Sequence, residues 1–174
     1  MAKSATADLL RPPGAGPPLG AASPAFLLAQ VGAQAAAQFA ERLIPLGLAP
    51  AHAGLLRLVH ASEGLSQQAL CAKLGIAPSR VVALVDDLEQ RGFVARRDHP
   101  HDRRSYALYL TDDGRNTLKS IGKIAREHQD ALCAALNVDE RAQLASLLTR
   151  IAKQQGLTPG VHPGLSRVRG WSCL

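Results

Sequence analysis

Aromatic residues make up only 3% of this 174-residue chain, which argues against the aromatic-rich core of a β-sandwich. Alanine is abundant instead, and a high alanine content favours helices. The three cysteines, Cys71, Cys133 and Cys173, have no CxxC or paired spacing, so the sequence predicts neither a disulfide framework nor a zinc ribbon. The length suits one domain with a single core.

The sequence has little that would direct it to a membrane. Its first residues lack the apolar run of a signal peptide. The longest uncharged stretch inside the predicted fold, residues 23–40, carries Gln30, Gln34 and Gln38, which form a polar stripe on one helix face. We therefore expect an amphipathic helix there, a protein of the reducing cytoplasm, and no membrane partner.

Signatures of catalysis are also missing. The sequence contains no Gly-rich phosphate loop, no nucleophile elbow and no pair of carboxylates placed to face a pocket. The run from His99 to Asp102 offers no spaced second pair of ligands for zinc. We expect no enzyme activity, no metal and no cofactor.

The charge balance is basic. Lysine and arginine number 20 against 14 acidic residues, which gives a net charge of +6 and a pI near 9.7. Such a balance permits a nucleic-acid partner. No segment is a polybasic block, however, so the argument for DNA has to rest on geometry.

Hydrophobic periodicity and the positions of proline and glycine divide the chain into elements. We predict a flexible N-terminal tail over residues 1–24, a single domain over 25–155 and an irregular C-terminal tail over 156–174. Inside the domain we predict helices over 24–44, 50–61, 66–74, 78–91, 111–135 and from 137 onward, and two strands at 93–97 and 105–110 around a polar tip at 98–104.

Three of the predicted helices begin at recognisable caps. Ser66 and Thr111 are N-cap residues, and Asn137 with Glu140 forms a capping box. The last two helices also carry apolar stripes that we expect to face inward. These stripes are Leu118, Ile121, Ala125, His128 and Leu132 on the first, and Leu144, Leu147, Leu148 and Ile151 on the second.

The order helix, turn, helix and two-stranded hairpin over residues 62–111 is the layout of a winged helix-turn-helix. We predict a mainly α fold with a small β-hairpin wing (α+β). In it, Cys71 is a small packing residue and Gly75 supplies the positive φ of the turn. The two short helices would cross and bury Leu70, Leu74, Ile76, Val81 and Leu84.

The second helix of this pair has an outward face suited to the major groove, with its N-terminal residues nearest the base edges. That face holds Ser79, Arg80, Ala83 and Asp87.

The hairpin is rich in arginine, with five arginines and two aspartates between residues 91 and 104. The arginines at its two sides are Arg96, Arg97, Arg103 and Arg104. An arginine at a hairpin tip can enter the narrow minor groove or hold a phosphate. Asp102 can pair with Arg104 and fix the direction of its guanidinium. The predicted DNA-binding residues are Ser66, Gln67, Pro78, Ser79, Arg80, Ala83, Arg97, Asp102, Arg103 and Arg104.

These motifs resemble the MarR family of bacterial transcription regulators over about residues 48–148. The resemblance rests on the stretch from Leu84 to Val94 (LVDDLEQRGFV), on Arg97 and the Asp-Arg-Arg run that begins at Asp102, and on Leu110 with Thr111. It implies a homodimer whose N- and C-terminal helices interlock and whose two winged lobes bind a palindromic operator.

The resemblance also implies that Arg104 is the minor-groove arginine and that Asp102 supports it. One departure is notable: where the family often has Thr-Arg, this chain has Val82 and Ala83. Base recognition should therefore depend more on Ser79 and Arg80.

A dimer is also expected from the residues themselves, because long amphipathic helices over 25–61 and 112–155 flank the small winged segment. Two lobes roughly add their binding free energies on half-sites about 34 Å apart, one turn of DNA.

Proteins that resemble this family usually respond to small, often anionic aromatic molecules. The expected function is therefore a dimeric transcription regulator, most simply a repressor released by such an effector. Candidate effector-binding residues are Phe39, His52, Leu56, Val59, His60 and His128. Sensing by cysteine is a weaker alternative, because the first helix contains none and Cys71 reads as a packing residue.

Two other functions remain open at this stage. A winged-helix module could bind protein instead of DNA, and the acidic residues Asp86, Asp87 and Glu89 near the reading helix leave room for that. A sequence-nonspecific architectural protein would bind any duplex with equal affinity.

Overall fold

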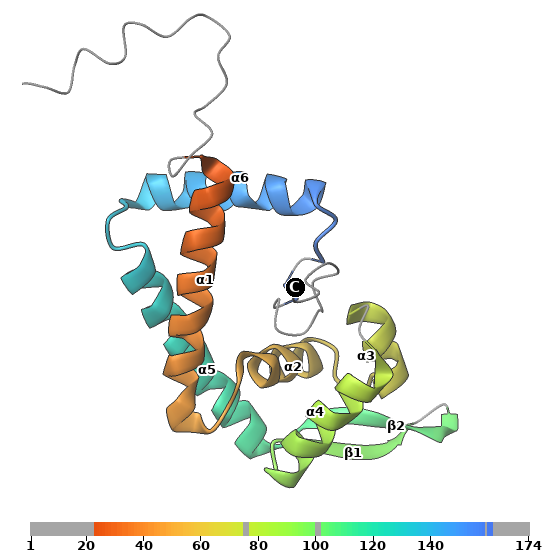
Figure 1. The fold of residues 1–174 in the computed structure, drawn as a ribbon. Helices are drawn as coiled ribbons and strands as arrows, with labels where there is room; N and C mark the ends of the chain where they lie inside the picture. Colours follow the sequence, from red (N-terminus) through yellow and green to blue (C-terminus); the bar gives the residue numbers. More distant parts are fainter. Residues whose placement is uncertain (1–22, 75–76, 100–101, 159, 162–174) are drawn as a thin grey trace, which may run out of the picture. The chain divides into compact units, whose positions relative to one another are not determined.

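The computed structural model describes residues 23–74, 77–99, 102–158 and 160–161, and for residues 74 and 102–104 it describes the backbone alone. Six helices and a two-stranded antiparallel hairpin follow one another in these ranges (Figure 1), which confirms the predicted fold class. The elements are α1 (Pro24–Leu43), the 3-10 turn η2 (Ile44–Leu46), α2 (Pro50–Ala61), α3 (Gln67–Leu74), α4 (Pro78–Gln90), β1 (Val94–His99), β2 (Asp102–Leu110), α5 (Asp112–Leu132) and α6 (Val138–Gln154).

The described residues belong to two units, which divide between Ala37 and Gln38. The first contains most of α1, on which Phe26, Leu27, Leu28 and Val31 are all exposed. The second contains every other element. No single described helix is long and apolar enough to cross a membrane; only the pair Pro24–Leu46 and Pro50–Ala61, taken together across a bend of 77°, meets that test of length and composition.

The predicted caps define where three helices begin. Ser66 Oγ accepts a hydrogen bond from the Ala69 backbone N–H at 3.2 Å. Thr111 Oγ1 accepts one from the Gly114 N–H at 3.0 Å. At α6, Asn137 and Glu140 bond reciprocally through side chain and backbone. Each cap satisfies N–H groups that have no partner in the first turn of a helix, which explains why these boundaries could be read from the sequence.

The winged lobe, which consists of α2, α3, α4, β1 and β2, closes around an apolar core. Leu70 and Val81 are buried as predicted, and Leu84 and Cys71 are partly buried against the core. The predicted roles of Gly75, Ile76 and the Leu74 side chain lie outside the described part of the structure. The buried residues of the lobe are Ala53, Leu55, Leu56, Val59, Leu70, Val81, Val85, Leu88, Val94, Ala107, Leu108 and Leu110.

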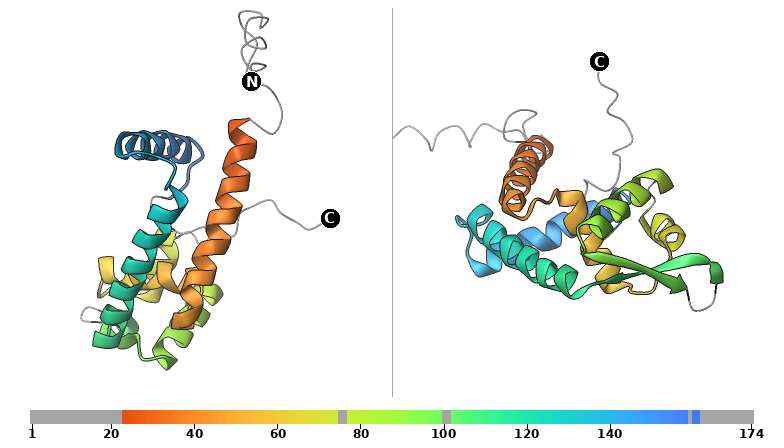
Figure 2. Two further views of the ribbon diagram at one scale, coloured as in Figure 1. Left: turned by 90° about the vertical axis from the view of Figure 1, so that its left-hand side faces the viewer. Right: turned by 90° about the horizontal axis from the view of Figure 1, so that it is seen from below.

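The wing is longer than its sequence pattern indicated. The strands pair from Val94 with Leu110 to His99 with Asp102, and the register shifts between Asp98 and His99. The prediction of a polar tip over residues 98–104 was therefore wrong for most of that segment, because a hairpin that projects into solvent needs backbone pairing but no apolar alternation. Figure 2 shows the hairpin as an arm whose end extends beyond the helices.

A third segment extends the base of the wing. The Gly64 N–H donates to the Leu108 carbonyl at 2.9 Å, and the Leu108 N–H donates to the Leu65 carbonyl at 3.0 Å. Ser66 continues this pairing as an isolated bridge to Ala107. The start of α3 is thereby attached to β2.

The first turn of α5 packs so closely on Phe93, just before β1, that only glycine fits at position 114. A Cβ atom there would lie 1.9 Å from the Phe93 carbonyl oxygen. Thr111 strengthens the same junction, because its hydroxyl donates to the Gly92 carbonyl at 2.5 Å. The junction between the wing and the long helix α5 is therefore closely packed and hydrogen-bonded.

The apolar stripe of α6 does not face inward within the chain, contrary to the prediction. Its four members, Leu144, Leu147, Leu148 and Ile151, are 37–45% exposed. On α5, Ile121 is buried, whereas Ala125 and Leu132 are exposed. Periodicity shows that a helix has an apolar face, but it does not show whether the same chain covers that face.

Candidate nucleic-acid interface and adjoining pocket

Helix α4 presents a polar, solvent-exposed N-terminal half. Pro78 occupies the first turn, where a missing N–H costs nothing. Ser79, Arg80 and Ala83 are exposed, while Val81 and Val85 are buried on the opposite face, as the helical period requires. The residues predicted to read bases therefore share one surface of the helix.

The two residues predicted to contact DNA at the start of α3, Ser66 and Gln67, are less exposed than those of α4. The hydroxyl of Ser66 caps α3, and the side chain of Gln67 is half-buried. The Nε2 atom of Gln67 is buried without a hydrogen-bond partner among the described residues.

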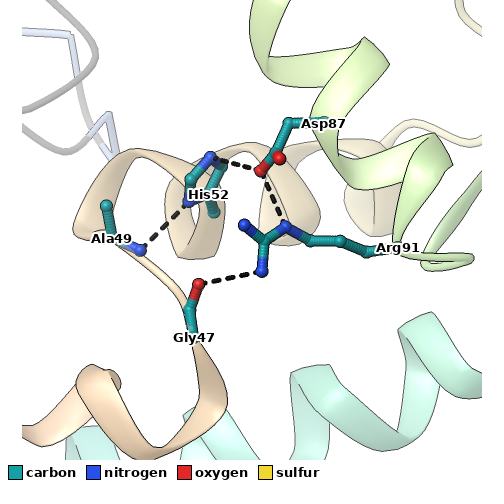
Figure 3. Close-up of polar contacts among 5 residues, drawn as sticks. All are labelled: Gly47, Ala49, His52, Asp87 and Arg91. Carbon is teal, nitrogen blue, oxygen red and sulfur yellow. Dashed lines mark hydrogen bonds and ion pairs between the residues drawn. The ribbon is translucent and has the colours of Figure 1, made fainter.

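The structure gives Asp87 a different role from the outward, DNA-facing one that the sequence suggested. Its Oδ2 atom accepts from Arg91 Nε at 2.8 Å and lies 3.1 Å from His52 Nε2 on α2. Arg91 also donates to the Gly47 carbonyl at 3.0 Å (Figure 3). Asp87 thus joins the C-terminal half of α4 to α2 and to the turn after η2.

The contacts of His52 select one neutral tautomer of its ring. The Ala49 backbone N–H donates to Nδ1 at 3.0 Å, so Nδ1 carries no proton and Nε2–H faces Asp87. Burial lowers the pKa of His52 more than the Asp87 carboxylate raises it. The hydrogen bond from Arg91 holds the pKa of Asp87 below its ordinary value against the opposing effect of burial.

The arginines of the wing divide into two kinds. Arg96, on β1, makes ion pairs with both Asp86 and Glu89 of α4. Its backbone N–H also donates to Glu89 Oε1 at 3.2 Å. Although burial opposes the charge of Arg96, the two carboxylates together raise its pKa. Arg96 therefore fastens the wing to α4, and its guanidinium is engaged by these two carboxylates.

Arg97, the next residue, is exposed and lies with its guanidinium carbon 4.9 Å from the centre of the Tyr109 ring. Asp102, Arg103 and Arg104 belong to β2. Their side chains, including the predicted pairing of Asp102 with Arg104, lie outside the described part of the structure.

A pocket of about 370 Å³ lies between α2 and α5. It is apolar apart from one guanidinium, that of Arg57 on α2. Sequence reasoning missed Arg57, because a helix pattern does not show which exposed arginine borders a cavity. The lining residues are Phe39, Pro50, Ala53, Gly54, Arg57, Leu118, Ile121, Gly122, Ala125 and Gly160.

Of the predicted effector-binding residues, the structure brings Phe39 and His128 together. Phe39 lines the pocket, and its ring centre lies 5.5 Å from that of His128. Nδ1 of His128 is buried without a hydrogen-bond partner among the described residues. Burial, with the charge of Arg42, lowers the pKa of His128.

His128 contacts Phe39 but does not itself line the pocket, and neither do the other four predicted residues. Leu56 and Val59 are core residues, and His60 is exposed. His52 uses both ring nitrogens in the contacts already described.

The packing of α3 against α4, followed directly by the hairpin fastened through Arg96, defines a winged helix-turn-helix protein. Its sequence relatives narrow this class. A family model for the MarR family matches residues 46–105. A protein of Thauera aromatica, assigned as transcriptional regulator of the hcr operon, is 34% identical over 113 residues, which cover 65% of this chain and 68% of that one.

Solved structures agree. The transcriptional repressor CouR, bound to a 23-mer DNA duplex, is 35% identical, with a TM-score of 0.68 over 79% of this chain and 99% of that one. Wild-type apo MarR from E. coli shares the fold, with 22% identity and a TM-score of 0.66 over 74% of this chain and 96% of that one. The chain belongs to the MarR family of transcription regulators.

Proposed function

We propose that this protein is a homodimeric, cytoplasmic repressor that binds a palindromic operator and leaves it when a small aromatic anion binds. It acts as a regulator and not as an enzyme. The observation that carries the proposal is the exposed N-terminal half of α4, with Ser79 and Arg80, on a lobe whose wing projects beyond it.

In this proposal α4 enters the major groove. Arg80 and Ser79 contact base edges, and Pro78 and Ala83 allow close approach on either side. Ser66 and Gln67 lie at the start of α3, the helix that crosses the backbone in this class of protein.

The wing supplies the second contact. Arg97, Arg103 and Arg104 bind phosphates or the minor groove, and Asp102 orients Arg104. Contacts in two grooves fix the register of the helix on the duplex, which a single inserted helix would leave loosely defined.

The charges on the lobe favour DNA over a protein partner. The acidic residues that left room for a protein-binding module, Asp86, Asp87 and Glu89, are paired with Arg96, Arg91 and His52. They therefore present little uncompensated negative charge near the reading helix.

The exposed stripe of α6 and the apolar residues of α1 support a homodimer. Apolar side chains such as Leu147, which is 45% exposed, gain stability only when a second surface covers them. Segments 25–61 and 112–155 would supply the interface, and two lobes would then reach two half-sites.

The pocket between α2 and α5 suits the effector. The apolar walls and the ring of Phe39 suit an aromatic ring, and the guanidinium of Arg57 can donate hydrogen bonds to a carboxylate. The ligand would act by favouring one spacing of the two lobes over another.

The test is fluorescence anisotropy with duplex DNA from upstream of the gene that encodes the protein, compared with a shuffled duplex over a range of salt concentrations. We expect a preference of about 10³-fold or more at near-physiological salt. Equal and steeply salt-dependent binding would instead indicate an architectural protein, and no binding to either duplex would indicate a protein-interaction module.

Two variants test which residues contact the bases and which contact the phosphates or the minor groove. Arg80→Ala should relax the preference at particular bases by about 1–3 kcal/mol each, and Arg104→Ala should weaken binding to all sequences and reduce the salt slope by about 1. Arg126→Ala removes an equal charge from an exposed position on α5 and serves as the control. An unchanged salt slope for Arg104→Ala would contradict the role of the wing.

A further inference from the structure

The chain that follows α6 returns to the effector pocket of its own lobe. We name residues 156–158 and 160–161 the C-terminal strap. Gly156, with φ of 66°, ends α6, and the Leu157 N–H donates to the Ala152 carbonyl at 3.0 Å. Val161 is half-buried and packs against the core. Figure 1 shows the chain descending from the end of α6 toward α2.

The strap occupies the one charged group that lines the pocket among the described residues. Arg57 Nη2 donates to the Gly160 carbonyl oxygen at 3.2 Å, and Gly160 itself lines the pocket. A backbone carbonyl is a neutral acceptor, whereas a carboxylate forms a shorter and roughly twice as strong bond to guanidinium. An anionic ligand would therefore compete with the strap for Arg57 on favourable terms.

We propose that the C-terminal strap is a built-in competitor of the effector: it holds Arg57 in the ligand-free protein and must leave when an aromatic anion binds. The inference rests on the proposed effector pocket. It adds that the affinity for the ligand depends on the difference in strength between two hydrogen bonds of Arg57, one to the carboxylate of the ligand and one to the Gly160 carbonyl. Because the strap begins directly after α6, its release also frees the end of that helix.

Two glycines of the strap allow a matched test. A Cβ atom on Gly160, whose φ is 74°, would lie 2.7 Å from Arg57 Nη2. Gly156 has a similar φ of 66°, but a Cβ atom there meets nothing within 4 Å. Alanine at either position strains the backbone to a similar degree, yet only Gly160→Ala forces the strap and Arg57 apart.

The experiment titrates the full-length protein with 1-anilinonaphthalene-8-sulfonate, an aromatic anion that becomes fluorescent in apolar surroundings. Bound probe is then displaced with benzoate. We expect Gly160→Ala to bind both compounds roughly three- to tenfold more tightly than the wild type, because the hydrogen bond that competes for Arg57 is lost. Val161→Ser, which weakens the apolar contact of the strap, should act in the same direction. Gly156→Ala should match the wild type.

Arg57→Gln separates this inference from the proposed function. It should weaken binding of both anions, and Gly160→Ala added to Arg57→Gln should then have little effect. If Arg57→Gln weakens binding while Gly160→Ala behaves like Gly156→Ala, the proposal of an effector pocket is supported and the proposal that the strap competes with the ligand is wrong. If Arg57→Gln changes nothing in either background, the effector pocket itself is wrong, and the strap proposal fails with it.

Discussion

The winged lobe and helix α6 carry the same kind of apolar periodicity, but the chain buries the apolar side chains of the lobe and leaves those of α6 exposed. In the lobe, Leu70, Val85 and Leu88 are fully buried by neighbouring elements of the same chain. On α6, residues such as Leu144 and Leu147 remain 38–45% exposed. The lobe is therefore complete as a folded unit, whereas α6 has an apolar face that its own chain does not cover.

This difference separates two sources of stability. The core of the lobe contributes its free energy at any protein concentration. An uncovered face contributes only when a partner is bound, so its contribution depends on concentration through mass action. Substitutions of the same chemistry in the two regions should consequently give different results.

The largest effect is expected from Leu88→Ala. Leu88 is 0% exposed, and truncating a buried leucine leaves a cavity that costs about 2–5 kcal/mol of unfolding free energy. Urea denaturation at several protein concentrations measures this cost, which should be independent of concentration. Leu147→Ala is the matched control, and its cost should grow as the wild type associates. If the loss of unfolding free energy in Leu88→Ala depended on protein concentration, the core of the lobe would not be complete within one chain.

The second prediction tests the uncovered face directly. Leu147→Asp places a charge on the stripe of α6 and should raise the dimer dissociation constant by about 10–100-fold, because a carboxylate would lose hydration at the interface. Sedimentation velocity measures the shift toward monomer. Ser146→Asp adds the same charge to an exposed residue on the other side of α6 and should leave the mass unchanged. A monomeric wild type at micromolar concentration would refute the dimer.

The third prediction sharpens the comparison inside the lobe. Arg96→Gln should cost about 1–2 kcal/mol of stability, because Asp86 and Glu89 lose a partly buried partner, and it should weaken DNA binding as well. Arg97→Gln should leave stability within about 0.5 kcal/mol and weaken DNA binding alone. Denaturation and anisotropy on the same samples distinguish them. Equal stability of the two variants would show that Arg96 does not fasten the wing.

The smallest effect concerns His52. Its pKa is lowered in the folded protein, so the unfolded chain takes up the proton more readily. The stability that neutral His52 contributes is therefore present above its ordinary pKa of 6.5 and is lost as the pH falls through the lowered folded value.

Glutamine at position 52 keeps an acceptor for the Ala49 N–H and cannot titrate. The difference in unfolding free energy between wild type and His52→Gln should therefore shrink between about pH 7 and pH 5. His128 titrates in the same range but is present in both proteins, so its contribution cancels. A difference that stays constant with pH would show that the imidazole does not need to be neutral.

Local features of the fold were predictable because they depend on neighbouring residues. The caps at Thr111 and Asn137 follow from side chains that bond within one turn, and the structure reproduces them. The bounds of α2 follow from Pro50 in its first turn and from the break after Ala61. Leu70 and Val81 were identified as core residues for the same reason, since helical spacing fixes which side of a helix they share.

Tertiary polar contacts were not predictable in this way. Asp87 has the spacing of an outward-facing residue, but its partner His52 lies 35 positions earlier in the chain. Gly47, whose carbonyl accepts from Arg91, lies 44 positions before that arginine. The pairing of Arg96 with Asp86 and Glu89 left a faint signal, because the two acids are three positions apart on one helix face. For Arg57 there was none, since its partner Gly160 lies 103 residues away.

The ion pairs of Arg96 have a kinetic consequence. They bind a strand of the wing to two successive turns of α4, so the hairpin and the helix cannot tilt separately. In the complex that we propose, the DNA contacts of the helix and those of the wing would therefore form and break together. Each lobe should dissociate from DNA in a single step, without an intermediate in which only the wing remains bound.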